Sequence, residues 1–131
     1  MHACARDAYA FLADGRSLGR WALGCFETKL AGDGLFVGHS LFDGKPLFVR
    51  IEGDPSALVV IYHVGSTADR LSPRIRATVL PRGHAGTQDQ ECVVSLVARR
   101  EPDMTQERWR HVTVIHETEI LLIKALIERD R

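Results

Sequence analysis

A chain of 131 residues suffices for one domain with its own core, and by size scaling such a domain buries roughly two thirds of the surface that its unfolded form exposes. Hydrophobic residues make up 45% and charged residues 26%, which excludes a disordered or fibrous protein. The 17 basic and 17 acidic side chains cancel, so no net field attracts a phosphate backbone, and we expect no nucleic-acid partner.

Two short helices are predicted at the start of the chain. Within residues 5–12 the apolar side chains recur at helical spacing, and Asp14-Gly15 then provides a stop. A second helical turn over residues 16–21 has Leu18 and Trp21 three positions apart, on one face. We therefore expect two small helices before the first strand.

A meander of strands follows these helices. From Leu23 the apolar pattern changes to period two, and turn-forming sequences interrupt it at residues 32–34, 43–44, 53–56 and 81–83. This pattern predicts six antiparallel strands, at approximately residues 23–30, 35–42, 46–52, 58–64, 71–80 and 90–99. Alternation predicts one buried and one solvated face, with Leu47, Val49, Ile51, Ile75, Ala77 and Val79 alternating with Phe48, Arg50, Glu52, Arg74, Arg76 and Thr78.

One long helix is predicted at the end of the chain. Asp103 or Thr105 can cap it, and it runs to about Glu128, which at 1.5 Å per residue makes it roughly 40 Å long. Its apolar stripe, which we expect against the sheet, comprises Trp109, Val112, His116, Ile120, Ile123 and Ile127, with Glu117, Lys124 and Glu128 on the opposite side. Val114 and Leu121 lie off the stripe, where a second contact such as a dimer interface can use them.

Several loose motifs accompany this order of elements. They are residues 8–14 (AYAFLAD) with Leu18 and Trp21, Gly34 and Gly38, residues 71–75 (LSPRI), and Glu119 with Lys124. With two short helices, a meander and a long terminal helix, the chain resembles the polyketide cyclase/dehydrase-type members of the START and Bet v 1-like (SRPBCC) superfamily, which have the helix-grip fold.

The resemblance implies one α+β domain over residues 1–131. In such a domain an antiparallel sheet of six to seven strands wraps around the long C-terminal helix and leaves a cavity for a hydrophobic small molecule. Family members begin with a full strand that pairs with the last strand, whereas only residues 1–4 precede the first helix here. An unpaired last strand favours pairing with a second copy, so a homodimer is one alternative.

In that fold, the candidates for chemistry are polar side chains that face the cavity. His116, in the middle of the helix stripe, can act as a general acid or base, hold a ligand carbonyl, or be a core histidine bonded to the backbone. Glu119 lies one turn further on, within reach of His116, although we favour a solvated position at the edge of the stripe. Ile120 would line the cavity from the same stripe.

The strands and the second short helix supply three further candidates. Tyr62 shares its strand face with Val60, so its phenol is either a ligand contact or core packing. His39 lies between Val37 and Leu41 in the period-two pattern and is expected to point inward with them. Trp21 lies at the expected mouth, as a wall for the ligand or as an anchor between helix and sheet.

Several other chemistries are excluded by spacing. Residues 116–120 (HETEI) begin like the zinc-protease motif but lack its second histidine, and residues 32–38 (GDGLFVG) join two strands, so neither a metal nor a dinucleotide site is expected. There is no glycine-flanked serine. The three cysteines, Cys4, Cys25 and Cys92, match no zinc pair or disulfide framework and suit a reducing cytoplasm. We expect no cofactor.

The first residues are charged and no window has the roughly 20 apolar residues of a membrane span, so we expect a cytoplasmic protein. Two functions fit the resemblance: binding of a hydrophobic or aromatic molecule with proton transfer by His116, Tyr62 or Glu119, or a carrier or sensor of a lipid-like ligand without chemistry. A third is a protein-interaction module resembling the Hsp90-activating co-chaperone domains. The rival fold, the NTF2-like cone, places its longest helix first.

Overall fold

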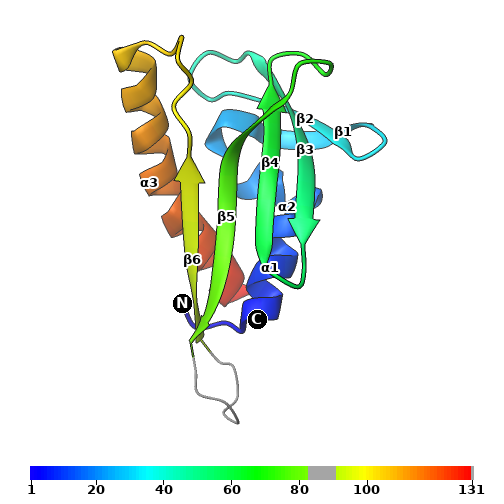
Figure 1. Cartoon of the computed structure of the whole chain (residues 1–131), viewed down its shortest axis with the longest axis vertical. Coiled ribbons are helices and arrows are strands. Elements are labelled where there is room, and N and C mark those ends of the chain that lie inside the picture. Colours follow the sequence, from blue (N-terminus) through cyan, green and yellow to red (C-terminus); the bar gives the residue numbers. More distant parts are fainter. Residues whose placement is uncertain (83–90, 131) are drawn as a thin grey trace.

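The chain forms two short helices, a six-stranded sheet and a long helix, in the predicted order (Figure 1). The computed structural model describes residues 1–82 and 91–130. The helical elements are α1 (Ala5–Ala13), α2 (Gly15–Trp21), the 3-10 helix η1 (Leu23–Cys25) and α3 (Gln106–Arg129). The strands are β1 (Phe26–Gly32), β2 (Leu35–His39), β3 (Pro46–Asp54), β4 (Val59–Gly65), β5 (Ser72–Arg82) and β6 (Glu91–Ala98).

The sheet is an antiparallel meander in which the strands lie in chain order from β1 to β6. Gly34 and Gly44, in the first two predicted turns, have φ values of 66° and 70°, which glycine adopts without a steric penalty. After β3, the Asp54 carboxylate accepts hydrogen bonds from the backbone N–H groups of Ser56 and Ala57 and so fixes the third turn. β5 extends through Arg82, and residue 83 of the fourth predicted turn lies outside the described residues.

The alternation predicted for the central strands is confirmed with one exception. Val49, Val60, Tyr62, Ala77 and Val79 are buried and belong to one core. This core lies on the side of the sheet that α1 covers, because α1 contacts β3, β4, β5 and β6. We call this side the inner face. The exception is Arg74, at a β-bulge described below.

Some strand ends differ from the prediction. Residues 23–25 form η1 instead of strand, with the Cys25 N–H donating to the Ala22 carbonyl at 3.0 Å. β2 ends at His39, and Leu41, predicted to point inward, is 54% exposed in the loop that follows. Residue 90, the predicted first residue of the last strand, lies outside the described part of the chain.

The long C-terminal helix is confirmed, and Thr105 is its cap, since its hydroxyl accepts a hydrogen bond from the Arg108 N–H at 3.0 Å. α3 lies along β6 and also contacts α1, α2 and η1 (Figure 1). Its buried side is rotated from the predicted stripe and consists of Ile115, Glu119, Ile123 and Ile127. Val112, His116 and Ile120 are only partly buried, at the flank of this side. None of the helices within residues 1–82 and 91–130 is long and apolar enough to cross a membrane.

The N-terminal residue pairs with the last strand. The Met1 ammonium donates to the Cys92 carbonyl at 3.0 Å, and the Cys92 N–H donates to the Met1 carbonyl at 3.2 Å. This contact is at the position where the helix-grip resemblance expects a first strand. The whole is an α+β arrangement of sheet, short N-terminal helices and long C-terminal helix, which is compatible with a helix grip.

Candidate functional site

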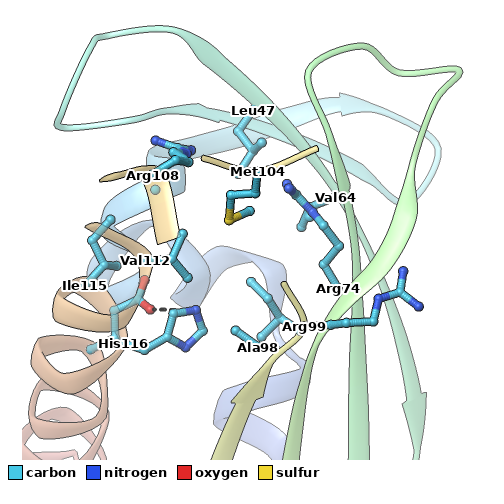
Figure 2. A pocket seen from close by; sticks show the side chains of 13 residues that line it. Leu47, Val64, Arg74, Ala98, Arg99, Met104, Arg108, Val112, Ile115 and His116 are labelled. Carbon is cyan, nitrogen blue, oxygen red and sulfur yellow. Dashed lines mark ion pairs between the residues drawn. The ribbon is translucent and has the colours of Figure 1, made fainter. Parts of the chain in front are cut away.

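A cavity of about 90 Å³ lies between the N-terminal half of α3 and the inner face of the sheet. Figure 2 shows Val112, Ile115 and His116 of α3 on one side of it, and Val64 and Arg74 of the sheet on the other. We call it the α3 cavity. It is lined by Gly24, Leu47, Val64, Arg74, Ile75, Ala98, Arg99, Met104, Arg108, Val112, Ile115, His116 and Glu119.

Two further spaces adjoin the α3 cavity, and all three share Gly24, Leu47 and Val64 as lining residues. The inner chamber, of about 40 Å³, is lined mostly by apolar groups: Leu18, Trp21, Ala22, Gly24, Cys25, Leu47, Val49, Tyr62, Val64, Ile75 and Glu119. The mouth, of about 390 Å³, is polar and is lined by Gly24, Ser40, Asp43, Lys45, Pro46, Leu47, Val64, Gly65, Ser66, Arg70, Ser72, Arg74, Glu101, Asp103 and Arg108. The site therefore changes from charged at its entrance to apolar in its depth.

Glu119 is positioned by a bond from the other end of the chain. Its Oε2 accepts a hydrogen bond from the Leu23 N–H of η1 at 2.9 Å, and the residue is only 4% exposed. The prediction of a solvated Glu119 is therefore wrong, because η1 offers a backbone donor that the helix pattern alone does not reveal. Burial raises the pKa of Glu119 to about 8, although the Leu23 bond opposes the shift. The protonated carboxyl is thus the main form at neutral pH.

His116 lies one helical turn before Glu119, with its Nε2 3.8 Å from the Glu119 Oε1. Burial lowers the pKa of His116, so the neutral imidazole is favoured at neutral pH. A protonated carboxyl and a neutral imidazole therefore lie side by side on the wall of the α3 cavity. Such a pair offers one group that can donate a proton and one that can accept a proton.

A β-bulge directs Arg74 into the site. Tyr62 pairs with Ile75 and the next residue, His63, pairs with Pro73, so Arg74 has no partner on β4. An extra residue of this kind changes the direction of a side chain. Arg74 consequently lines the α3 cavity and the mouth, with 25% of its side chain exposed, whereas Arg76 on the same strand stays on the exposed face. The predicted outward position of Arg74 is wrong for this reason.

Three buried side-chain nitrogens have no hydrogen-bond partner among the residues that the structure describes. They are Trp21 Nε1, Arg74 Nε and His116 Nδ1. Trp21 lines the inner chamber, Arg74 the mouth and the α3 cavity, and His116 the α3 cavity, so all three belong to one set of adjoining spaces. Leaving a buried donor or acceptor unpaired costs about 1–3 kcal/mol, which makes these atoms the natural contacts of a polar group on a ligand.

Most of the predicted site residues meet at this place. Trp21, His116 and Glu119 line the adjoining spaces, and so does Tyr62, whose hydroxyl donates to the Leu12 carbonyl at 2.6 Å. The Tyr62 phenol is thus already used to hold the end of α1 against β4. Ile120 packs against the core from the flank of α3 and is not a lining residue of these spaces.

His39 lies elsewhere. Its side chain is 40% exposed, its Nε2 is 3.6 Å from the Glu27 Oε1, and its ring packs edge-on against Phe26. The expectation that it points inward is wrong, because Gly38, its neighbour on β2, faces η1 and the core. A Cβ at Gly38 would lie 2.6 Å from the Cys25 backbone, so only glycine fits there. That close approach turns His39 to the outer side.

Arg74, Arg108 and Met104 are lining residues that the sequence did not single out. Arginines are common on the surface, both beside a strand and in the first turn of a helix. Only the spatial arrangement therefore distinguishes Arg74 and Arg108 from other surface arginines. No group of three or more His, Cys, Asp or Glu within the described ranges could hold a metal ion.

Comparisons with known proteins report a shared fold only. No protein-family model matches the chain, and no curated protein matches it. Among solved structures, the chain is similar to the crystal structure of an uncharacterised protein from Bacillus thuringiensis, with a TM-score of 0.64 and 14% sequence identity. The match covers 97% of this chain and 93% of the other, so the similarity extends over nearly the whole fold.

Proposed function

We propose that this chain is a helix-grip protein of the START and Bet v 1-like type that binds a hydrophobic or aromatic small molecule between α3 and the sheet. One observation carries the proposal: Trp21 Nε1, Arg74 Nε and His116 Nδ1 are buried, have no hydrogen-bond partner within the described residues, and belong to side chains that line the α3 cavity or the inner chamber. An apolar pocket with a few convergent polar groups is the usual form of a small-molecule site.

The size of the spaces limits what can enter. A cavity of roughly 150 Å³ holds a benzene molecule, whereas the α3 cavity measures about 90 Å³ and the inner chamber about 40 Å³. Both spaces are smaller than that, so the depth accepts a short aliphatic chain as it stands and accepts a ring only when α3 moves away from the sheet. The rest of the ligand would occupy the mouth, whose 390 Å³ falls within the usual range for ligand pockets.

Acid–base catalysis is the second candidate function, and the His116–Glu119 pair favours it. The two groups are 3.8 Å apart with both side chains mostly buried, and their pKa values are shifted so that both are neutral at neutral pH. A neutral imidazole can take a proton from a bound molecule while the carboxyl donates one, which is what a cyclisation or dehydration requires. The alternative is a carrier or sensor in which the pair only orients the ligand.

Mass spectrometry of the protein purified under native conditions tests the binding function. We expect an apolar molecule of low mass to be released on denaturation, and His116→Ala to reduce its occupancy several-fold. His63→Ala is the control, because His63 pairs with Glu52 at 2.8 Å on the exposed face of the sheet. If neither the wild-type protein nor the two variants convert the bound ligand, the carrier function is favoured. If the wild-type protein converts the ligand and His116→Ala does not, the enzyme function is favoured. A protein that releases no ligand and takes up no apolar probe would contradict the proposal.

A further inference from the structure

Two of the arginines that line the mouth, Arg74 and Arg108, also line the α3 cavity. Arg74 reaches it from the bulge in β5, and Arg108 from the first turn of α3. Both line the α3 cavity as well as the mouth, and Figure 2 shows both side chains at the upper end of the cavity, near Met104. Arg99 is different, because its guanidinium points away from the cavity in the same view.

The charge of these arginines is only partly balanced. Arg74 forms its ion pair with Glu101, whose Oε1 lies 3.9 Å from the Arg74 Nε, and the charge of Asp103 also favours the guanidinium. The same Glu101 oxygen accepts hydrogen bonds from Arg99 and Ser72, each at 3.4 Å. Arg108 forms no salt bridge with any described residue. Burial lowers the pKa of Arg74, and the positive charges of Arg108 and Arg99 both lower it further. Burying a guanidinium is costly unless it has its own oppositely charged partner, so a bound anion would stabilise the Arg74 and Arg108 side chains.

The acidic groups of the mouth set a limit on that anion. Lys45 and Arg70 add two further positive charges, and the carboxylates are Asp43, Glu101 and Asp103. The four basic side chains thus exceed the three acidic ones by one, which suits a singly charged group better than a phosphate dianion. The planar guanidinium also matches a carboxylate in geometry, with two parallel N–H donors for two oxygens.

We propose that the ligand is a small carboxylic acid, whose carboxylate binds Arg74 and Arg108 at the mouth while its short apolar chain enters the α3 cavity. This inference rests on the proposed binding function and deepens it by naming the chemical class of the ligand. The orientation follows from the polarity of the site, because the basic groups lie at the entrance and the apolar walls with the neutral His116–Glu119 pair lie in the depth.

A matched pair of probes tests the inference: hexanoate and hexanamide have the same chain and length and differ in charge. We expect the carboxylate to bind at least tenfold more tightly, as measured by chemical-shift titration of the ¹⁵N-labelled protein. A tenfold difference in affinity corresponds to about 1.4 kcal/mol. Tighter binding of hexyl phosphate than of hexanoate would overturn the assignment to a carboxylic acid.

Four variants locate the effect. Arg74→Gln should reduce carboxylate affinity about tenfold and leave amide affinity within twofold, whereas Arg76→Gln, two residues along β5 on the exposed face, should change neither. Glu101→Gln should raise carboxylate affinity several-fold, because it removes the acidic group that competes for Arg74. Arg108→Gln, at an exposed position outside the core, gives a second test of the cluster should Arg74→Gln destabilise the fold.

The outcomes separate the two proposals. Equal affinity for carboxylate and amide, or an unchanged preference in both Arg74→Gln and Arg108→Gln, contradicts the carboxylic acid and leaves the apolar binding site standing. Uptake of neither probe, together with no ligand in the purified protein, contradicts the binding function itself.

Discussion

At the scale of single residues, Glu119 dominates the behaviour of this site. It is a carboxyl group in the core of a small protein, satisfied on one oxygen by Leu23 and facing His116 with the other. Burial also raises the pKa values of Tyr62 and Cys25, and a charge on Glu119 would raise both further. The buried surroundings of Glu119 therefore favour its protonated, neutral form.

This arrangement predicts that Glu119 makes the protein less stable as the pH rises. The pKa of Glu119 is about 8 in the folded state against an ordinary value of 4.5, so the unfolded state loses its proton first. Relative to Glu119→Gln, the wild-type protein should lose up to roughly 4 kcal/mol of unfolding free energy between pH 4 and pH 9, with most of the loss between pH 4.5 and 8. Urea denaturation at a series of pH values measures this difference.

The Gln substitution keeps an oxygen for the Leu23 N–H, so the comparison isolates the charge. His116 does not imitate the effect, because its lowered pKa costs stability as the pH falls below about 6.5, the opposite direction. Glu117→Gln, at an exposed position on the same helix, is the control and should leave the pH dependence unchanged. A constant difference between wild type and Glu119→Gln across this pH range would show that the carboxyl is ionised when folded.

At the scale of elements, β2 and η1 approach each other closely at Gly38. A Cβ there would lie 2.6 Å from the Cys25 carbonyl carbon and oxygen and 2.7 Å from the Phe26 oxygen, all backbone atoms. We expect Gly38→Ala to cost roughly 1–3 kcal/mol, because the backbone must shift to make room. The same shift would move Leu23 and weaken its bond to Glu119, so ligand affinity should fall as well.

Gly32→Ala is the matched control for Gly38→Ala. Its Cβ would meet only the Leu35 Cβ at 3.9 Å, an ordinary contact. Thermal unfolding followed by circular dichroism should show Gly32→Ala close to wild type and Gly38→Ala several degrees lower. If both variants unfold at the wild-type temperature, β2 and η1 are not packed as closely as the structure has them.

The elements themselves could be predicted from the sequence, because local patterns determine them. The period-two runs around Leu47 and Ile75, the glycines of the turns and the Thr105 cap each act over a few residues. The strand predicted at residues 23–30 began too early, because η1 is fixed by contacts with Gly38 and Glu119 that lie far along the chain.

The site could be predicted only in part. His116 stands out as a polar residue in an apolar stripe, and the structure does place it on the cavity wall. The apolar stripe predicts a solvated Glu119, because that stripe differs by a small rotation from the side that α3 buries. Strict alternation predicts an outward Arg74, whereas a β-bulge shifts the alternation by one residue there and leaves no clear mark in the sequence.

At the scale of the whole molecule, α3 has two different roles along its length. Its C-terminal half closes the core, with Ile123 and Ile127 fully or almost fully buried. Its N-terminal half forms one wall of the α3 cavity, where Ile115 is a lining residue. A single amphipathic helix thus stabilises the fold at one end and leaves room for a ligand at the other.

This division predicts a gradient in the cost of substitution along α3. Ile123→Ala should cost roughly 2–5 kcal/mol, since its side chain is 0% exposed and its loss opens a hole in the closed core. Ile115→Ala should cost clearly less, because its neighbours already border free space, but it should enlarge the α3 cavity and change ligand affinity or size preference. Leu121→Ala, at a position that is 67% exposed, should stay within about 0.5 kcal/mol of wild type. Urea denaturation of the three variants without ligand measures these losses of unfolding free energy. A loss in Ile115→Ala as large as that in Ile123→Ala would mean that the N-terminal half of α3 closes the core in the same way and leaves no cavity beside it.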